Sequence, residues 1–255
     1  MNAVVEAARK KGCLIIHCPS GGGKLYADTP MRKLAASGAT VINGGTLSIA
    51  GDGNLGTGNL QLQDGTLRVT GAGTIDNAIV LGNGLFVNTI ETTNDTTLSG
   101  VISGSGDVIK TGSGALTLSA SNSATGTLTA SAGTVLIDGS YDGQVSAQST
   151  GTVGGNGTLN GLVAIFSGGP LAAGSSPGSL TINGNLQLET GSTLAVDISG
   201  TTAGTEYDQL TVNGTVTINN ALLTVNLGSY SPPFSSSFTI ISNDGADAIS
   251  GTFSG

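Results

Sequence analysis

The residues whose types could perform metal chemistry gather near the start of the chain. The sequence has two cysteines, Cys13 and Cys18, and one histidine, His17, and all three lie in this segment. Thiolates and imidazoles are favoured zinc ligands. A structural zinc site needs four ligands, and three candidates within one short segment cannot surround the ion. On one strand, side-chain alternation would point the two cysteines to opposite faces, which disfavours a disulfide. We therefore expect free thiols and no metal.

The segment that follows, residues 19–24, has the composition of a phosphate-binding loop, PSGGGK. The backbone N–H groups of such a loop surround a phosphate, and Lys24 would neutralise it. The Walker pattern fails at both ends, because Cys18 stands where Gly is needed and Leu25 replaces the Ser or Thr that holds magnesium. We predict a turn here, without a nucleotide or any other cofactor.

Carboxylates could support a third kind of chemistry, the cleavage of polysaccharides by clustered acids, often with calcium and a basic residue. The candidate acids are Asp64, Asp76, Asp138 and Asp142, and Arg68 and Lys110 are the cations that could assist them. These acids show no regular spacing that would bring two of them together on neighbouring turns of a repetitive fold. A catalytic site needs groups that converge. We expect solvated turn acids, and we assign no catalytic, cofactor-binding or metal-binding residue.

Two acidic segments closer to the C-terminus have structural explanations. Glu206, Tyr207 and Asp208 precede a strand-like segment, and we expect Tyr207 to close an edge of the core while Asp208 caps a turn. Residues 243–247, NDGAD, contain oxygen ligands suited to calcium. They form one loop and no array of calcium-binding repeats, so turn acids are the simpler interpretation.

The elements that must position these residues fall into two unlike pieces. Residues 1–37 contain six Lys or Arg and two acids, a charge of +4, whereas residues 38–255 contain two cations and fourteen acids, a charge of −12; the sum is the −8 of the whole chain. So few cations disfavour a nucleic-acid partner. No apolar stretch is long enough to span a membrane, and the start lacks the apolar region of a signal peptide.

In the first piece, residues 2–11 have the spacing and end signals of a helix, and residues 13–17 form an apolar run typical of a parallel strand. We interpret 1–37 as a basic helix-strand leader that is no independent domain. Its sequence, AVVEAARKKGCLIIHCPSGGGKLYADTPMRKLA, resembles a fragment of the isochorismatase-like cysteine hydrolases. The resemblance does not extend to that family's catalytic residues, so none is assigned to Cys13 or Cys18.

The second piece repeats one phrase. Examples are GTLSI at 45–49, GTLRV at 65–69, GALTL at 114–118 and GTVTI at 214–218. Each phrase places alternate apolar residues on one face of a half-buried strand, and the period is near twenty residues. One coil cannot bury its own apolar face, but stacked coils can. The repeats therefore predict an all-β right-handed parallel β-helix, a β-solenoid, over 38–255, with a short N-terminal helix-strand segment ahead of it.

Corners and ends of this solenoid also have sequence signals. Gly and Asn tolerate the left-handed backbone of tight corners, and Asn43, Asn54, Asn59 and Asn83 are the corner candidates. Prolines are absent between Pro30 and Pro170 and then return, and Phe234 lies close to Phe238 in the sequence. We predict a cap from about residue 200 that protects the last edge strands.

Residues 104–139, GSGDVIKTGSGALTLSASNSATGTLTASAGTVLIDG, resemble the passenger-associated repeat of bacterial autotransporters. Ser123 and Ala124 depart from it, because the repeat often has an aromatic residue after Asn122. Residues 151–161, 171–200 and 207–225 are similar to the C-terminal end of such β-helices. The resemblance implies a secreted or cell-surface passenger, with the translocator barrel in another part of the protein.

For function, the resemblance favours a non-catalytic structural or adhesive module. Its partners would be host or environmental glycans or other cell-surface proteins, without nucleic acid. One alternative is a carbohydrate-active β-helix lyase or hydrolase. Another is a truncated or chimeric reading frame with no function of its own, which the sharp change of charge near residue 37 would explain.

Overall fold

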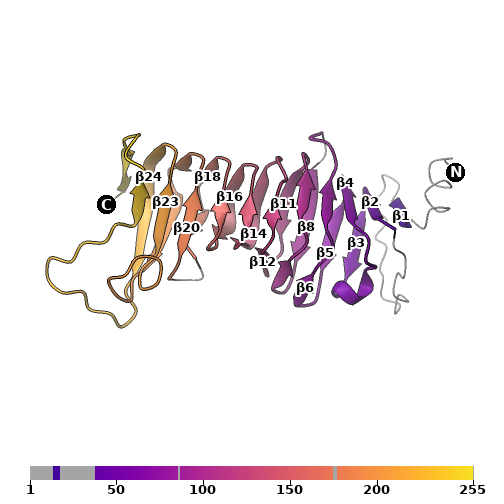
Figure 1. The fold of residues 1–255 in the computed structure, drawn as a ribbon, viewed down its shortest axis with the longest axis horizontal. Coiled ribbons are helices and arrows are strands. Elements are labelled where there is room, and N and C mark those ends of the chain that lie inside the picture. The colour runs from indigo at the N-terminus through magenta and orange to yellow at the C-terminus, as the bar shows by residue number, and fades with distance from the viewer. Residues whose placement is uncertain (1–13, 18–37, 86, 175–176, 255) are drawn as a thin grey trace.

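The computed structural model describes residues 14–17, 38–85, 87–174 and 177–254. In these ranges the chain forms a stack of coils along one axis, with its start at one end and residue 254 at the other (Figure 1). Every pairing between named strands is parallel and joins neighbouring coils. One short 3-10 helix, Asp52–Asn54, interrupts an early coil. The described chain is thus a parallel β-solenoid.

Each complete coil contributes strands to three faces. The first face contains β1 (Leu14–His17), β2 (Thr40–Asn43), β4 (Leu60–Gln63), β7 (Ile79–Leu81) and β10 (Ile102–Gly104), followed by β13 (Ser121–Asn122), β15 (Ser140–Tyr141), β17 (Thr158–Leu159), β20 (Ser179–Ile182), β23 (Gln209–Val212) and β25 (Ile241–Asn243). The second contains β3 (Thr46–Ile49), β5 (Thr66–Val69), β8 (Val87–Thr92), β11 (Asp107–Thr111), β18 (Val163–Ile165), β21 (Leu186–Leu188) and β26 (Ser250–Ser254).

The third face contains β6 (Gly73–Ile75), β9 (Thr96–Leu98), β12 (Ala115–Leu118), β19 (Pro170–Ala172) and β22 (Thr193–Asp197). Three longer strands turn the corner between the second and third faces and contribute to both: β14 (Leu128–Ile137), β16 (Val145–Gly154) and β24 (Val216–Asn226). Pro170 begins its strand, a position where a proline removes no needed ladder bond.

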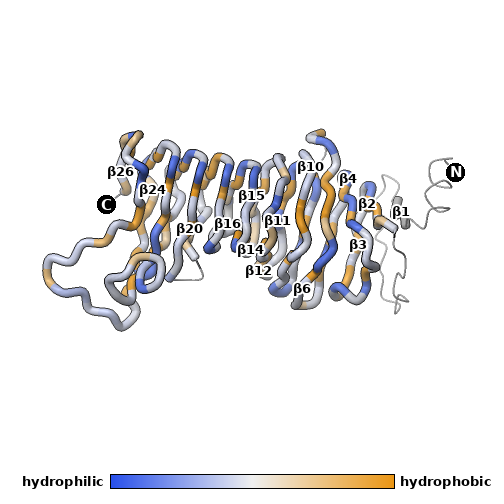
Figure 2. Tube along the Cα trace, in the orientation of Figure 1, coloured by the Kyte–Doolittle hydropathy of each residue, from blue (hydrophilic) through white to orange (hydrophobic). Residues whose placement is uncertain are grey.

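The core lies inside the coils and is built from rows of equivalent residues. Leu47, Leu67 and Ile90 pair in register on the second face, and Ile165, Leu188 and Ile218 continue the row at the far end. All six are buried. Hydrophobic and hydrophilic residues alternate along the coils (Figure 2), as strands with one buried face require. The alternation predicted from the repeated phrases is confirmed.

The first face changes sheets between β10 and β13, and Asn122 connects the two sheets. Its side chain is 2% exposed. Its Oδ1 accepts a hydrogen bond from Ile102 N at 2.8 Å, and its Nδ2 donates to Ala120 O and Ser140 O, both at 2.9 Å. A side chain thus replaces backbone bonds where the strand ladder is broken.

The corner residues differ in part from the prediction. The positive φ angles expected of asparagine corners occur instead at Gly44 (67°), Asp64 (59°) and Asn220 (52°), and none of Asn43, Asn54, Asn59 and Asn83 has one. Asn54 serves a corner in another way, since its Oδ1 accepts from Ala50 N and Gly51 N. A short side chain can stabilise a turn through hydrogen bonds without taking the left-handed conformation itself.

At the start of the described chain, β1 pairs with β2 in parallel, Leu14 opposite Thr40. The strand predicted over 13–17 is confirmed at 14–17, where it joins the solenoid sheet. The helix predicted over 2–11 lies outside the described residues. The division near residue 37 and the cap from about 200 stay predictions.

At the other end, the second half of β24 borders the third face. Leu223 and Val225 are exposed, although they lie in register with the buried Leu194 and Val196.

The described part of the chain contains no helix long and apolar enough to cross a membrane.

Leu188→Asp tests the core row directly. Leu188 is 0% exposed, so the variant buries an unpaired carboxylate, and we expect the free energy of unfolding to fall by about 3 kcal/mol or more. Chemical denaturation measures the change. Gln187→Asp, on the partly exposed opposite face of the same strand, is the matched control and should cost much less. Equal loss in both variants would contradict the core assignment.

Candidate functional site

The coils lengthen toward the C-terminal end of the solenoid. At one corner, side-chain hydrogen bonds join equivalent residues of successive coils, and their spacing along the chain gives the length of each coil. The spacing is 18 residues from Asp142 to Asn160 and 23 residues from Asn160 to Asn183. It then rises to 30 residues from Asn183 to Asn213. The regular coil length is therefore broken after Asn183.

Two long loops contain the additional residues. The first is the loop 198–208, between β22 and β23, and the second is the loop 227–240, between β24 and β25. The second loop lengthens the next coil as well, because Ser250 and Thr217, which pair in register and share a hydrogen bond, are 33 residues apart. Both loops leave the solenoid near the same end.

Asp208 fixes the base of loop 198–208. Its side chain is 2% exposed, and its Oδ1 and Oδ2 accept hydrogen bonds from Gly178 N at 2.7 Å and from Asp197 N at 2.8 Å. A carboxylate that accepts backbone N–H groups makes strong, charge-assisted bonds. Asp208 therefore connects the base of the loop to both ends of the preceding coil, which agrees with the turn-capping role predicted for it.

Glu206 orders the tip of the same loop. Its carboxylate accepts from Thr201 N at 2.9 Å and from Thr202 N at 2.8 Å. Hydrogen bonds from Thr202 and Thr201 lower the pKa of Glu206 below its usual value, because they favour the charged form. The backbone closes the loop as well, since Ser199 N donates to Glu206 O at 2.6 Å.

Tyr207 joins the two loops. It is buried, as predicted, and its ring contacts that of Phe238 edge-on, with centroids 5.3 Å apart. Edge-to-face contact is a favoured arrangement of two aromatic rings. Phe234 and Phe238, which are close in the sequence, do not share an apolar cluster, because Phe234 is fully exposed while Phe238 packs against the core.

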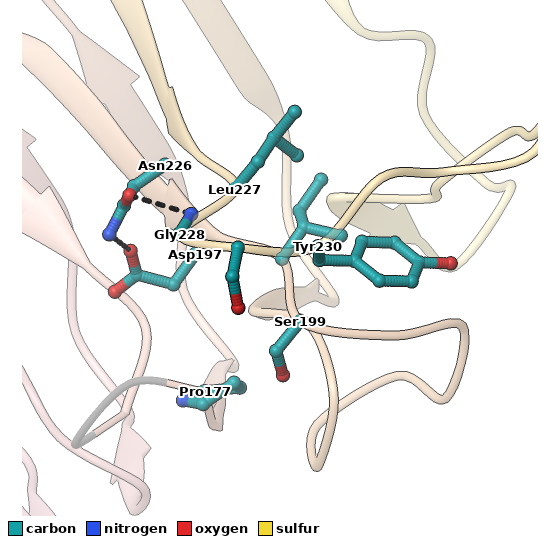
Figure 3. Close-up of a pocket in the computed structure, with 9 residues that line it drawn as sticks. Pro177, Asp197, Ser199, Asn226, Leu227, Gly228 and Tyr230 are labelled. Atoms are coloured by element: carbon teal, nitrogen blue, oxygen red, sulfur yellow. Dashed lines mark hydrogen bonds between the residues drawn. The ribbon is translucent and has the colours of Figure 1, made fainter.

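A pocket of about 530 Å³ lies between these loops, lined by Pro177 and by residues 197–199 and 226–230. Asp197 and Asn226 face each other on adjacent coils, and Asn226 Nδ2 donates to Asp197 Oδ1 at 2.6 Å (Figure 3). The Asn226 side chain is held in turn by Gly228 N, which donates to its Oδ1 at 3.1 Å. Ser199 and Pro177 lie on the Asp197 side, and the ring of Tyr230 points away from Asp197 (Figure 3). The volume is in the range of small-molecule sites, ~300–1,000 Å³.

The acids named from the sequence have structural roles elsewhere. Asp138 Oδ1 accepts from Asn156 N at 3.1 Å, and Asp142 Oδ1 accepts from Asn160 Nδ2 at 2.6 Å, so each carboxylate bonds to the next coil. Asp64 has the left-handed backbone of a corner. Asp76 N lies 3.4 Å from Asp52 Oδ1, a neighbour that the spacing did not reveal. In residues 243–247, Asn243 Nδ2 donates to Asp247 O within one turn.

The described residues include no group of three or more His, Cys, Asp or Glu side chains placed to hold a metal. Cys13, Cys18 and residues 19–24 lie outside the described part of the chain, so the interpretations of free thiols and of a turn stay predictions.

Lys110 was expected to be a cation available to a substrate, and the structure shows that this expectation is wrong. It is 0% exposed and points into the core, in register with Ile90 and Ala130. Its Nζ donates to Thr111 O, Gly112 O and Ala132 O at 2.8, 3.0 and 3.1 Å. Three carbonyls thus satisfy the three donors of the ammonium. Burial lowers the pKa of Lys110 from 10.5 to about 8, and the Glu91 carboxylate opposes that shift.

Arg68, the other candidate cation, bonds to a neighbouring coil. Its Nε lies 2.8 Å from Glu91 Oε2, and the two residues are in register on β5 and β8. The pair is partly exposed, where ion pairs contribute little to stability. Lys110 thus bonds to carbonyl groups, and Arg68 pairs with Glu91, an acid that the sequence did not single out.

These features define a repetitive parallel β-solenoid with two ordered loops near one end. The chain is similar to part of the Adhesin BmaC autotransporter of Brucella suis biovar 1 (strain 1330), with 33% identity over 201 residues. The match covers 70% of this chain and 6% of that adhesin, so the chain spans a small part of its relative. No family model and no solved structure matches the chain. The resemblance to autotransporter passengers seen in the repeats is confirmed.

Asp208→Asn should loosen the loop 198–208. The amide keeps one acceptor oxygen and turns an NH₂ group toward the second backbone donor, which is then unsatisfied. We expect the free energy of unfolding to fall by about 1–3 kcal/mol and hydrogen exchange in the loop to accelerate. Asp138→Asn, at an exposed residue that accepts one backbone bond, is the control. Unchanged exchange in Asp208→Asn would show that this carboxylate does not hold the loop.

Because Lys110 is buried, we also expect the free energy of unfolding to have an unusual pH dependence. The folded chain binds the Lys110 proton less tightly than the unfolded chain, so this residue's contribution to stability rises as pH increases from about 8 to 10.5. Relative to Lys110→Met, the wild type should gain about 2 kcal/mol between about pH 7.5 and pH 9.5.

Denaturation curves of both chains across this range measure the gain. Burial raises the pKa of Tyr141 far above its usual value, so that side chain lowers stability only above about pH 10, where its phenol would ionise in the unfolded chain. A constant difference between wild type and Lys110→Met would contradict the prediction.

Proposed function

We propose that this chain is a non-catalytic adhesive module of a cell-surface or secreted autotransporter passenger. The observation that supports this most is the similarity of a large part of the chain to the Brucella adhesin, on a solenoid whose acids bond to neighbouring coils. Such a scaffold presents long, regular faces to a partner. Host or environmental glycans and other surface proteins are the partners we propose.

A carbohydrate-active enzyme has less support from the described residues. Retaining and inverting glycosidases need two carboxylates facing one bond, with separations of about 5–9.5 Å, and no metal-assisted cluster compensates here. In the loop that borders the pocket, Asp208 and Glu206 already accept backbone N–H groups. Their role in holding the loop favours binding over catalysis.

Adhesion can be tested with beads that carry the purified chain. We expect them to attach to cultured epithelial cells or to matrix-coated surfaces more strongly than beads coated with albumin, because the folded solenoid presents the binding surface. Beads carrying Leu188→Asp, which should lose the fold, are the matched control. Equal attachment of wild-type and albumin beads would contradict the proposal, and release of new reducing ends from a polysaccharide would favour the enzyme.

A further inference from the structure

We propose that the pocket between loops 198–208 and 227–240 binds a neutral saccharide, as one hexose unit of a glycan. The proposal deepens the adhesive function and depends on it. The first residues of both long loops line the pocket, and its lining includes an acceptor and a donor that are already paired with each other, Asp197 and Asn226.

The charge of the surroundings determines the class of ligand. Residues 111–255 contain eight acids and no Lys, Arg or His, so an anionic sugar or a phosphate would meet Asp197 without any compensating cation. A free metal ion is also a poor fit. Asp197 is the single carboxylate in the lining, and it already accepts from Asn226 at 2.6 Å. A neutral ligand with several hydroxyl groups avoids both costs.

The polar lining is suited to neighbouring hydroxyls. The Oδ1 of Asp197 accepts from Asn226, and its Oδ2 has no hydrogen-bond partner among the described residues of the pocket, so Oδ2 can accept a hydrogen bond from a hydroxyl group. Asn226 uses one of its two amide protons on Asp197 and can donate the other. Because these groups are adjacent, they can bind two vicinal hydroxyls of one ring. Leu227 and Pro177 add apolar surface for its C–H groups.

The site is also ordered before a ligand arrives. Gly228 N holds Asn226, Asp208 holds the backbone of Asp197, and Glu206 O accepts from the Ser199 hydroxyl at 3.0 Å. A ligand therefore has few protein groups to immobilise, and preorganisation of this kind increases affinity. The rigid coils below position the loops, as in many binding sites on regular scaffolds.

The experiment uses the isotope-labelled chain and NMR titration with single sugars. D-glucose, D-galactose, D-mannose and N-acetyl-D-glucosamine are the neutral probes, and D-glucuronate and calcium chloride are the charged comparisons. We expect at least one neutral sugar to shift the amide signals of Ser199, Gly228 and Ser229 in a saturable way, and glucuronate and calcium to leave them unchanged.

Two variants form a matched pair. Asp197→Asn removes the acceptor charge in the pocket and should weaken sugar binding by about tenfold or more. Asp142→Asn changes the same kind of carboxylate-asparagine pair, also 2.6 Å long, at a different place on the solenoid, and should bind like the wild type. Ser199→Leu places a bulky side chain in the lining of the pocket and removes the Ser199 hydroxyl bond to Glu206 O, while the Asp197–Asn226 pair stays in place, so it should also weaken sugar binding.

The outcomes separate this inference from the adhesive function. No shift with any neutral sugar, an equal loss in Asp142→Asn and Asp197→Asn, or binding of calcium or glucuronate alone would overturn the saccharide site. If wild-type and Asp197→Asn beads then attach equally to cells, adhesion stands and uses another surface. If neither bead attaches but sugars still shift the pocket amides, the adhesive function fails and the site remains.

Discussion

The parallel hydrogen-bonded ladder between coils is the constraint on which the rest of the structure depends. A single coil of about twenty residues cannot enclose its own apolar side chains, so every buried row exists because the next coil repeats it in register. The register of the strands also limits the size of the side chains that can follow one another along a row. Lys110 lies beside Ala130, and Ala130 beside Ala147, so a long side chain is followed by two small ones. Gly133, with φ of 68°, lies next to the Lys110 ammonium, where a Cβ would approach Nζ within 2.9 Å.

Corners are the weak points of such a ladder, because carbonyls turn out of register there and need other donors. Side chains supply these donors inside the solenoid: Lys110 for three carbonyls, Asn122 for two, and Asn77, whose Nδ2 donates to Gly56 O and Gly58 O. On the outside, an amide ladder follows one corner, with Asn183 donating to Asn160 and Asn213 to Asn183. Polar residues at the corners thus hold adjacent coils together, a role that Asp138 and Asp142 share.

The repeated phrases were sufficient to predict the fold class, the alternation of buried residues and core positions such as Leu47 and Leu67. The roles of Tyr207 and Asp208 also followed from their position before a strand. The pocket could not be predicted from the sequence, because Asp197 and Asn226 are 29 residues apart in the chain. Only the register of the ladder shows that they face each other. Lys110 was misjudged for a related reason. A lone Lys in an alternating strand is usually exposed, and only the carbonyls of two adjacent coils make its burial possible.

In a solenoid, the residues that form the coils and the residues that can bind a partner are different parts of the chain. Its coils need about twenty residues each, and the shorter step of 17 residues from Thr129 to Ser146 still closes a coil. The steps of 30 residues to Asn213 and 33 residues to Ser250 therefore exceed what the ladder requires. Residues beyond that requirement are free to vary without opening the core, yet here they are tightly held by Asp208, Glu206 and the Tyr207–Phe238 contact. Order that the scaffold does not need is most simply explained by a binding role, which is the physical reason to look for the ligand between these loops.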